Sequence, residues 1–247
     1  LLYTDGMKRL VLLGAGHAHL YILKQWALSP VADTEVVLVS PYPQAVYSGM
    51  VPGYVAGHFS LDQCQIPIEP LAQRAQIVFI PTAASEIKLQ EQQVVLANGQ
   101  CLEYDYLSLD MGSTIDRQAI PGAHELALFV RPMEIFVDLW QRMLEVAQEK
   151  PMRVSVIGAG AAGVELALAM KWRLKNNAVV SLITGGAPPC STYASQVQQR
   201  VMTALRRSNI ALLQITNLTC LALFSGGSKT YIYKSRYKGI PHPSFPI

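Results

Sequence analysis

Residues 153–163 read RVSVIGAGAAG, an apolar run that leads into three glycines at Gly158, Gly160 and Gly163. In a Gly-x-Gly-x-x-Gly turn between a strand and a helix, the first glycine permits a tight bend, the second lets the backbone approach a pyrophosphate, and the third lets the helix pack on the strand. The phosphate binds at the helix N-terminus, because unpaired N–H groups and the helix dipole favour negative charge there. A helical pattern over 164–174 follows the turn, as this fingerprint requires. The stretch therefore predicts a dinucleotide-binding site.

The same arrangement occurs a second time, near the start of the chain. An apolar run over residues 8–13 leads into GAGHAH at 14–19, and a helical pattern continues to Trp26. His19 stands where the third glycine would be, so we expect this helix to lie slightly farther from its strand. Because both copies have strand, turn and helix in the same order, the duplication is a stronger indication than either copy alone.

The segments around the two copies predict an α/β fold of the Rossmann-like class, with parallel sheets, flanking helices and a small antiparallel layer. The β-branched run at 35–39 predicts a strand buried on both faces, and 178–184 predicts its counterpart in the second copy. Asn98-Gly99 predicts a hairpin turn, and the Pro- and Gly-rich segment 40–57 predicts a loop with a function. We further expect helices over 68–75, 132–149 and 196–207 and strands over 77–80, 104–110 and 210–215, with no element after about residue 223.

Several polar residues near the two turns leave alternatives open. His17 and His19 either donate hydrogen bonds to a phosphate or are solvated or packed within the fold. Glu165, in the first turn of the second helix, either acts beside a nicotinamide ring or only complements the helix dipole. Ser40 and Thr184 stand where a carboxylate usually binds the adenosine ribose, so the choice between NADH and NADPH stays open. The His-x-His pair alone does not indicate a metal site, because other ligands are not evident.

Charge is distributed unevenly along the chain. All 17 acidic residues lie at or before Glu165, whereas the 20 basic residues continue beyond it. The acid-free stretch 166–247 either attracts anions, such as nucleotide phosphates, membrane lipid or nucleic acid, or is incomplete or not native coding sequence. Nucleic acid ranks last among these partners, because no aromatic platform or recognised binding motif accompanies the charge.

Cysteine spacing and hydropathy give no support to two further classes of protein, those with a metal or dithiol centre and those that span a membrane. The 4 cysteines are widely spaced and form no Cys-x-x-Cys pair, which gives no support to a metal or dithiol centre. No apolar run approaches the roughly 20 residues that a membrane-spanning helix needs. We therefore expect a soluble, cytoplasmic protein, with peripheral membrane association left open.

Taken together, the motifs resemble the two-dinucleotide flavoprotein family that includes the pyridine nucleotide-disulfide oxidoreductases and the type II NADH dehydrogenases. The resemblance covers roughly residues 8–215. Besides the two glycine turns it rests on VSP at 39–41, YDYL at 104–107, MGS at 111–113, PG at 121–122 and VEL at 164–166. More closely, GAGHAH at 14–19 followed by YSGMVPG at 47–53 is similar to the oxidoreductase fused to the N-terminus of some selenide, water dikinases.

The resemblance implies that the first unit holds FAD and that an inserted second unit holds NADH or NADPH. It divides the chain into a partial FAD-binding domain over 7–117, a partial NAD(P)-binding domain over 118–222 and an atypical tail over 223–247. The implied cofactor-binding residues are, for FAD, Gly14, Ala15, Gly16, His17, Ser40, Pro41, Ser48, Gly49, Met50, Ala84, Gly112 and Ser113 and, for the nicotinamide nucleotide, Gly158, Gly160, Ala161, Gly163, Glu165 and Thr184.

The reaction implied by the resemblance is hydride transfer from the nicotinamide to the flavin, followed by electron transfer to an unidentified acceptor. The flavin supplies the chemistry, and no catalytic acid, base or thiol is required. Relatives continue further, with a Gly-Asp turn for the flavin and a C-terminal interface domain, whereas this chain has no Gly-Asp dipeptide. We therefore expect a truncated chain that holds FAD poorly. The alternative is a non-catalytic nucleotide-binding module that partners a selenide, water dikinase.

Overall fold

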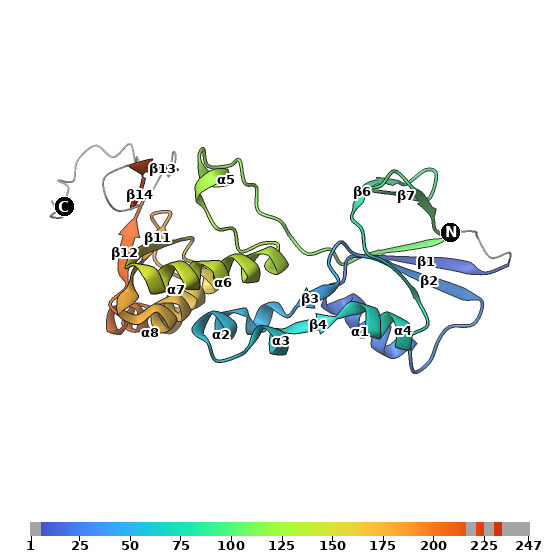
Figure 1. The fold of residues 1–247 in the computed structure, drawn as a ribbon, viewed down its shortest axis with the longest axis horizontal. Coiled ribbons are helices and arrows are strands. Elements are labelled where there is room, and N and C mark those ends of the chain that lie inside the picture. Colours follow the sequence, from blue (N-terminus) through green and yellow to red (C-terminus); the bar gives the residue numbers. More distant parts are fainter. Residues whose placement is uncertain (1–5, 216–220, 225–229, 234–247) are drawn as a thin grey trace. The chain divides into compact units, whose positions relative to one another are not determined.

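The computed structural model describes residues 6–215, 221–224 and 230–233, and this part of the chain forms two compact units (Figure 1). The first unit draws its described residues from Leu1–Val51, Ser60–Thr114 and Arg131–Glu134, and the second from Pro52–Phe59, Ile115–Val130 and Ile135–Ile247. Each unit contains a parallel sheet and one copy of the strand-turn-helix repeat. The predicted α/β fold and its duplication are confirmed, whereas the predicted domain boundaries stay predictions.

The sheet of the first unit is parallel throughout and has the strand order β5-β2-β1-β9. Its strands are β1 (Lys8–Leu13), β2 (Thr34–Val39), β5 (Val78–Ile80) and β9 (Tyr106–Leu109). Leu12 of the central strand β1 pairs with Leu38 on one side and with Ser108 on the other. Because parallel strands end at the same edge of a sheet, the residues that follow β1, β2 and β9 meet there.

One layer covers each face of this sheet. Helices α1 (His17–Trp26) and α4 (Ile68–Arg74) lie side by side on one face, and an antiparallel sheet of β6 (Ala84–Lys88), β7 (Gln93–Leu96) and β8 (Cys101–Glu103) packs on the other (Figure 1). Neighbouring side chains of a strand point to opposite faces, so alternate side chains of β1 and β2 pack against different layers. Val11, Leu13, Val37 and Val39 pack with Val94, Leu96, Leu102 and Tyr104, while Leu12, Val36 and Leu38 pack with Leu23, Ala45 and Ile68. The predicted antiparallel layer is confirmed, with Gly99 at a positive φ of 83° in its hairpin turn.

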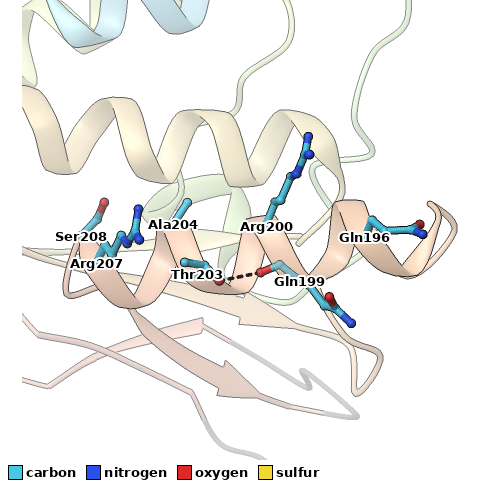
Figure 2. Close-up of a pocket in the computed structure, with 7 residues that line it drawn as sticks. All are labelled: Gln196, Gln199, Arg200, Thr203, Ala204, Arg207 and Ser208. Carbon is cyan, nitrogen blue, oxygen red and sulfur yellow. Dashed lines mark hydrogen bonds between the residues drawn. The ribbon is translucent and has the colours of Figure 1, made fainter.

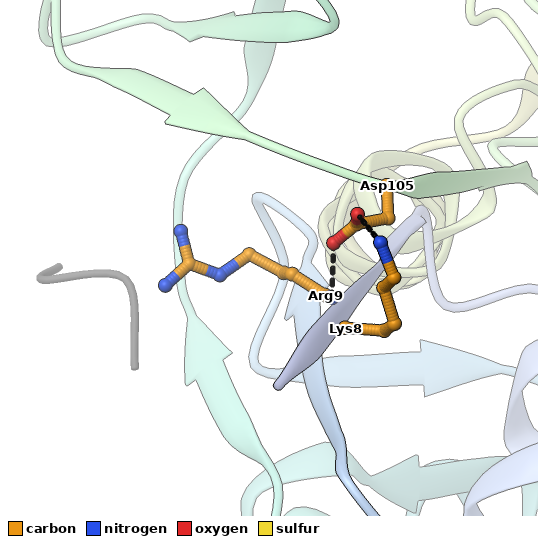
Figure 3. A network of polar contacts seen from close by, with 3 residues as sticks. All are labelled: Lys8, Arg9 and Asp105. Carbon is orange, nitrogen blue, oxygen red and sulfur yellow. Dashed lines mark hydrogen bonds and ion pairs between the residues drawn. The ribbon is translucent and has the colours of Figure 1, made fainter. Parts of the chain in front are cut away.

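Polar contacts hold the amino end of β1 in place (Figure 3). The Asp105 carboxylate accepts a hydrogen bond from the backbone N–H of Arg9 at 2.7 Å and pairs with the Lys8 ammonium at 2.8 Å. The backbone N–H of Asp105 in turn donates to the Arg9 carbonyl at 3.0 Å. The Arg9 guanidinium is buried and pairs with Glu35 of β2 at 2.6 Å. These contacts continue the pairing of β1 with its neighbours beyond the strand ladder.

The segment 40–57 is not the loop that its composition predicts. It contains β3 (Gln44–Val46), the 3-10 helix η1 (Ser48–Met50) and α2 (Val51–Ala56), followed by α3 (Leu61–Cys64) and β4 (Gln65–Pro67). The prediction fails because β3 is stabilised by pairing with β4, a partner that a local pattern does not reveal. Pro52 is tolerated because it is the second residue of α2, where a helix N–H has no intrahelical partner.

The second unit is built on a parallel sheet of order β10-β11-β12. Its elements are α5 (Ala123–Leu126), α6 (Met133–Glu149), β10 (Met152–Ile157), α7 (Ala161–Leu174), η2 (Lys175–Asn177), β11 (Ala178–Thr184), α8 (Ser195–Arg207) and β12 (Ala211–Gln214). Phe136 and Trp140 of α6 are fully buried, as is Leu182 of β11. Helix α7 begins at Ala161, three residues before its predicted start, because the glycine turn leads directly into the helix.

Strands are present where the sequence predicted none. β13 (Leu221–Phe224) and β14 (Thr230–Tyr233) pair antiparallel, with Ala222 opposite Ile232. The Ser- and Gly-rich composition around them hid the pairing, which joins two segments that are each only four residues long. The rest of the predicted tail lies outside the described residues. Within the described part of the chain, no helix is both long and apolar enough to cross a membrane.

Candidate functional site

The two glycine turns have the same backbone arrangement. Gly14 donates its N–H to the Val39 carbonyl at 2.8 Å, and Gly158 donates to the Ile183 carbonyl at 3.0 Å, so each turn is tied to the neighbouring parallel strand. Both glycines have a positive φ, 88° for Gly14 and 103° for Gly158, which disfavours any residue with a Cβ. The first glycine therefore has the expected role in both copies.

The second glycine of each turn is the N-cap of the helix that follows. Gly16 has φ −70° and ψ 179°, and Gly160 has φ −71° and ψ −179°, both extended. The carbonyl of each accepts the first helical hydrogen bond at 3.0 Å, from the N–H of Leu20 and of Val164 respectively. Helices α1 and α7 thus begin in the same way at the carboxyl end of the first strand of their copy.

In the second copy, the N-terminus of α7 is open. A Cβ on Gly160 would meet no described atom within 4 Å. The N–H groups of Ala161, Ala162 and Gly163 make no hydrogen bond to any described residue. A Cβ on Gly163 would overlap the Gly158 carbonyl, so the third glycine permits close packing of helix on turn. Free N–H groups at the positive end of a helix dipole are suited to a phosphate.

In the first copy, His19 replaces this glycine and is packed within the fold. It is only 1% exposed, with Nδ1 at 2.6 Å from the Gly14 carbonyl and Nε2 at 2.9 Å from the Ser108 hydroxyl. A carbonyl can only accept, so Nδ1–H donates to Gly14, and in the neutral imidazole Nε2 then accepts from the Ser108 hydroxyl. Of the two alternatives for His19, the structure supports packing. His17 is exposed, and its ring meets that of Tyr47 edge to face at 4.9 Å.

Asp110 is a residue at this site that sequence reasoning missed. Its carboxylate accepts hydrogen bonds from the N–H groups of Ala18 at 2.9 Å and His19 at 3.1 Å, at the N-terminus of α1. A Cβ on Gly16 would overlap this carboxylate, so the second glycine makes room for Asp110. Its position in the sequence could have indicated this role, because Asp110 directly follows the strand β9. Residues at the carboxyl ends of neighbouring parallel strands lie at the same edge of the sheet.

The structure brings most of the remaining FAD candidates to the same edge of the first sheet. Ser40 is buried directly after β2, followed by the exposed Pro41, and the exposed pair Gly112-Ser113 follows β9. The segment Ser48–Met50 forms η1, and the contact of Tyr47 with His17 places its start beside α1. Ala84 instead begins β6, where it pairs with Leu96 and packs against the core.

In the second copy, Thr184 ends β11 beside the glycine turn. It is 2% exposed, and its hydroxyl accepts a hydrogen bond from the Gly186 N–H at 3.3 Å. The chain then returns to the turn, where the Cys190 N–H donates to the Ala159 carbonyl at 2.8 Å. Glu165 is exposed on α7, and no described residue forms a hydrogen bond or ion pair with its carboxylate. Cys190 is a second contact that the sequence motifs did not indicate.

A separate hollow of about 730 Å³ lies along α8 (Figure 2). It is lined by Gln196, Gln199, Arg200, Thr203, Ala204, Arg207 and Ser208. The Thr203 hydroxyl donates to the Gln199 carbonyl within the helix at 2.9 Å. All the described lining residues come from one helix and its C-cap, and the predicted site residues are not among them, so this hollow is distinct from both glycine turns.

A family model described as pyridine nucleotide-disulphide oxidoreductase matches residues 8–222. Demethylphylloquinone reductase NdbB of Synechocystis is 23% identical over 227 residues, covering 88% of this chain and 56% of that protein. Alternative NAD(P)H-ubiquinone oxidoreductase C1 of Arabidopsis thaliana is 24% identical over 226 residues, covering 83% and 44% respectively.

A solved structure shows the same fold. NDH2 from Plasmodium falciparum in complex with NADH superposes with a TM-score of 0.73 at 16% identity, covering 92% of this chain and 51% of that one. The chain thus spans about half the length of the curated relatives it matches. The likeness shows the FAD/NAD(P)-binding, Rossmann-like fold that the two glycine turns predicted.

Proposed function

The chain belongs to the pyridine nucleotide-disulphide oxidoreductase family, and from this premise we propose that it forms the nucleotide-binding part of an FAD-dependent NAD(P)H oxidoreductase. The first unit binds FAD and the second binds NADH or NADPH. When bound, the flavin supplies hydride and electron chemistry. The single observation that carries the proposal is the repeated turn, in which Gly14 and Gly158 are tied to the next strand in the same way.

The residues of the second unit fit a dinucleotide pyrophosphate. Three consecutive N–H groups, those of Ala161, Ala162 and Gly163, have no described partner. Apart from its chain neighbours, no described residue comes within 4 Å of a Cβ built on Gly160, and a pyrophosphate needs such room to approach the backbone closely. Thr184, at the end of β11, supplies a hydroxyl in the position of the usual ribose-binding carboxylate. We propose that these residues bind and orient the nicotinamide nucleotide.

The residues of the first unit fit the pyrophosphate of FAD only in part. The N–H groups of Ala15 and His17 have no described hydrogen-bond partner, whereas those of Ala18 and His19 are bound by Asp110. In the proposed role, Ala15 and His17 bind phosphate oxygen. The packed His19 imidazole holds α1 against β9 and so fixes the direction in which these N–H groups point.

For the electron acceptor we propose a quinone. The support is that two relatives of this chain are named for quinone substrates, demethylphylloquinone in Synechocystis and ubiquinone in Arabidopsis thaliana. Hydride transfer from a nicotinamide to a flavin and electron transfer to a quinone require no protein thiol. Among the described residues, the cysteines Cys64, Cys101 and Cys190 are all free, and Cys64 and Cys190 are buried.

A finer proposal concerns the partner. The combination of residues 14–19 with 47–53 carries the resemblance to the oxidoreductase fused to selenide, water dikinases, and the ring contact of His17 with Tyr47 joins these two segments. We propose that a selenide, water dikinase binds this protein. Calorimetric titration of the purified kinase into the chain is expected to show saturable binding, and an absence of heat at micromolar concentrations would contradict the proposal.

Absorption spectroscopy tests the main proposal. The chain reconstituted with FAD is expected to be yellow, to bleach on anaerobic addition of NADH or NADPH, and to recover its colour when a quinone is added. A colourless protein that never binds added FAD would overturn the FAD assignment. Bleaching without recovery by a quinone would overturn only the acceptor.

A matched pair of variants tests the nicotinamide site. G160A adds a methyl group in open space at an allowed φ, so the fold should keep its stability while affinity for NADH falls at least tenfold. G163A should lower both stability and affinity, because its Cβ would overlap the Gly158 carbonyl. Unchanged NADH affinity in G160A would show that the nucleotide does not bind at this turn.

A further inference from the structure

The Asp110 side chain occupies the space before the N-terminus of α1. Oδ2 of Asp110 accepts hydrogen bonds from the second and third N–H groups of the helix, those of Ala18 and His19. Groups of this kind bind phosphate in a glycine fingerprint. We infer that Asp110 competes with the dinucleotide phosphate for the first fingerprint and so limits its affinity for FAD. The identity of the ligand rests on the proposed function.

The backbone fixes Asp110 at this position. Its N–H donates to the Leu13 carbonyl at 2.8 Å, and its carbonyl accepts from the Gly16 N–H at 3.1 Å. The backbone that carries the carboxylate is therefore fixed by hydrogen bonds of both its N–H and its carbonyl group to the segment around the glycine turn. Because a Cβ on Gly16 would overlap this carboxylate, the room that the fingerprint normally leaves for a pyrophosphate is occupied by an internal anion.

The second copy shows the same turn without a competing anion. The N–H groups of Ala162 and Gly163 correspond to those of Ala18 and His19, yet they bind no described residue. Apart from its chain neighbours, no described residue has an atom within 4 Å of a Cβ built on Gly160. At these two N–H groups the copies thus differ by the Asp110 carboxylate, which has no counterpart among the described residues at α7.

The competition has two physical causes. A phosphate that uses the N–H groups of Ala18 and His19 must displace the carboxylate, since each group has one proton to donate. A phosphate that binds only the N–H groups of Ala15 and His17, which have no partner among the described residues, lies beside a carboxylate, and two like charges a few ångströms apart repel each other. Removal of the carboxylate therefore strengthens phosphate binding along either route.

Three variants separate competition from a structural role. D110A removes the carboxylate, and D110N keeps an oxygen that can cap the helix but removes the charge. E103Q is the matched control, because Glu103 lies on β8 of the same unit, is exposed, and also loses one negative charge. The D110A chain without ligand should be less stable than the wild type, because the N–H groups of Ala18 and His19 lose their acceptor. A higher affinity together with a lower stability is a combination that a structural role does not produce.

The probe is inorganic pyrophosphate, followed by the backbone amide resonances of Ala18 and His19 in a nitrogen-15-labelled chain. In D110A we expect these resonances to titrate with at least tenfold tighter binding than in the wild type and in E103Q, with D110N between them. Equal midpoints in wild type and D110A, or no movement of the two resonances in D110A, would overturn the inference.

Flavin fluorescence with FAD completes the test and separates the two proposals. Tighter FAD binding in D110A supports both of them. If pyrophosphate moves the two amides more tightly in D110A but no variant binds FAD, the competition stands and the FAD assignment fails. If the wild type binds FAD and D110A binds pyrophosphate and FAD no better, the competition fails and the FAD assignment stands.

Discussion

His19→Ala should destabilise the first unit strongly. The imidazole is 1% exposed and joins three segments, the β1–α1 turn through the Gly14 carbonyl at 2.6 Å, strand β9 through the Ser108 hydroxyl at 2.9 Å, and α1 itself. Two lost hydrogen bonds cost about 1 kcal/mol each, and the remaining cavity and unpaired carbonyl add about 1 kcal/mol more. We expect the free energy of unfolding to fall by about 3 kcal/mol.

Hydrogen exchange measures this loss within the unit concerned. A loss of about 3 kcal/mol corresponds to exchange that is faster by roughly two powers of ten. It should appear in peptides from β1 and β9, whereas peptides from β10 and β11 in the second unit serve as the internal control. Ser108→Ala should cost about 1 kcal/mol, and its effect should nearly vanish in the His19→Ala background, because the two side chains share one hydrogen bond.

His19→Gly provides the sharpest comparison. It restores the third glycine of the fingerprint, yet we expect it to be less stable than His19→Ala by about 1 kcal/mol, since glycine is a poor helix former and replaces neither hydrogen bond. If His19 instead served to bind phosphate, His19→Ala would leave exchange in β1 unchanged and weaken only the binding of nucleotide. That result would refute the packing role.

Three further predictions follow from side chains away from the glycine turns. Trp140 is fully buried, and its indole N–H has no partner among the described residues. In urea denaturation, Trp140→Phe should therefore lower the free energy of unfolding by less than about 2 kcal/mol, and Trp140→Ala by about 4 kcal/mol. Equal losses in the two variants would contradict this prediction. Burial raises the pKa of the Cys64 thiol, which lowers its thiolate fraction at pH 8. Mass spectrometry should therefore find that iodoacetamide alkylates the exposed Cys101 well before Cys64. Similar alkylation rates of the two thiols in the folded chain would argue against the burial of Cys64. Asp105→Ala should lower the free energy of unfolding by about 2 kcal/mol, because the Arg9 N–H loses a charged acceptor at 2.7 Å. A loss below about 0.5 kcal/mol would show that this hydrogen bond contributes little to stability.

The predicted elements that the structure confirms are those with strong local patterns. The apolar run before each glycine turn forms β1 or β10, and the helical patterns after the turns form α1 and α7. Apolar periodicity and glycine turns depend on neighbouring residues, which is why a single sequence reveals them. The segment 40–57 was misread because β3 forms only by pairing with β4. The pair β13 and β14 was missed for the same reason.

The duplicated turn was determined by the sequence alone, since Gly14 and Gly158 each precede an N-cap glycine by two residues and follow an apolar strand. What lies before each helix was decided only by the tertiary structure. Asp110 reaches the N–H groups of Ala18 and His19 from more than ninety residues away in sequence. That contact arises because β9 lies beside β1 in a parallel sheet, which brings both carboxyl ends to one edge. Among the described residues, the same glycine pattern thus leaves the N–H groups of Ala162 and Gly163 without a partner in one copy, whereas a carboxylate binds those of Ala18 and His19 in the other.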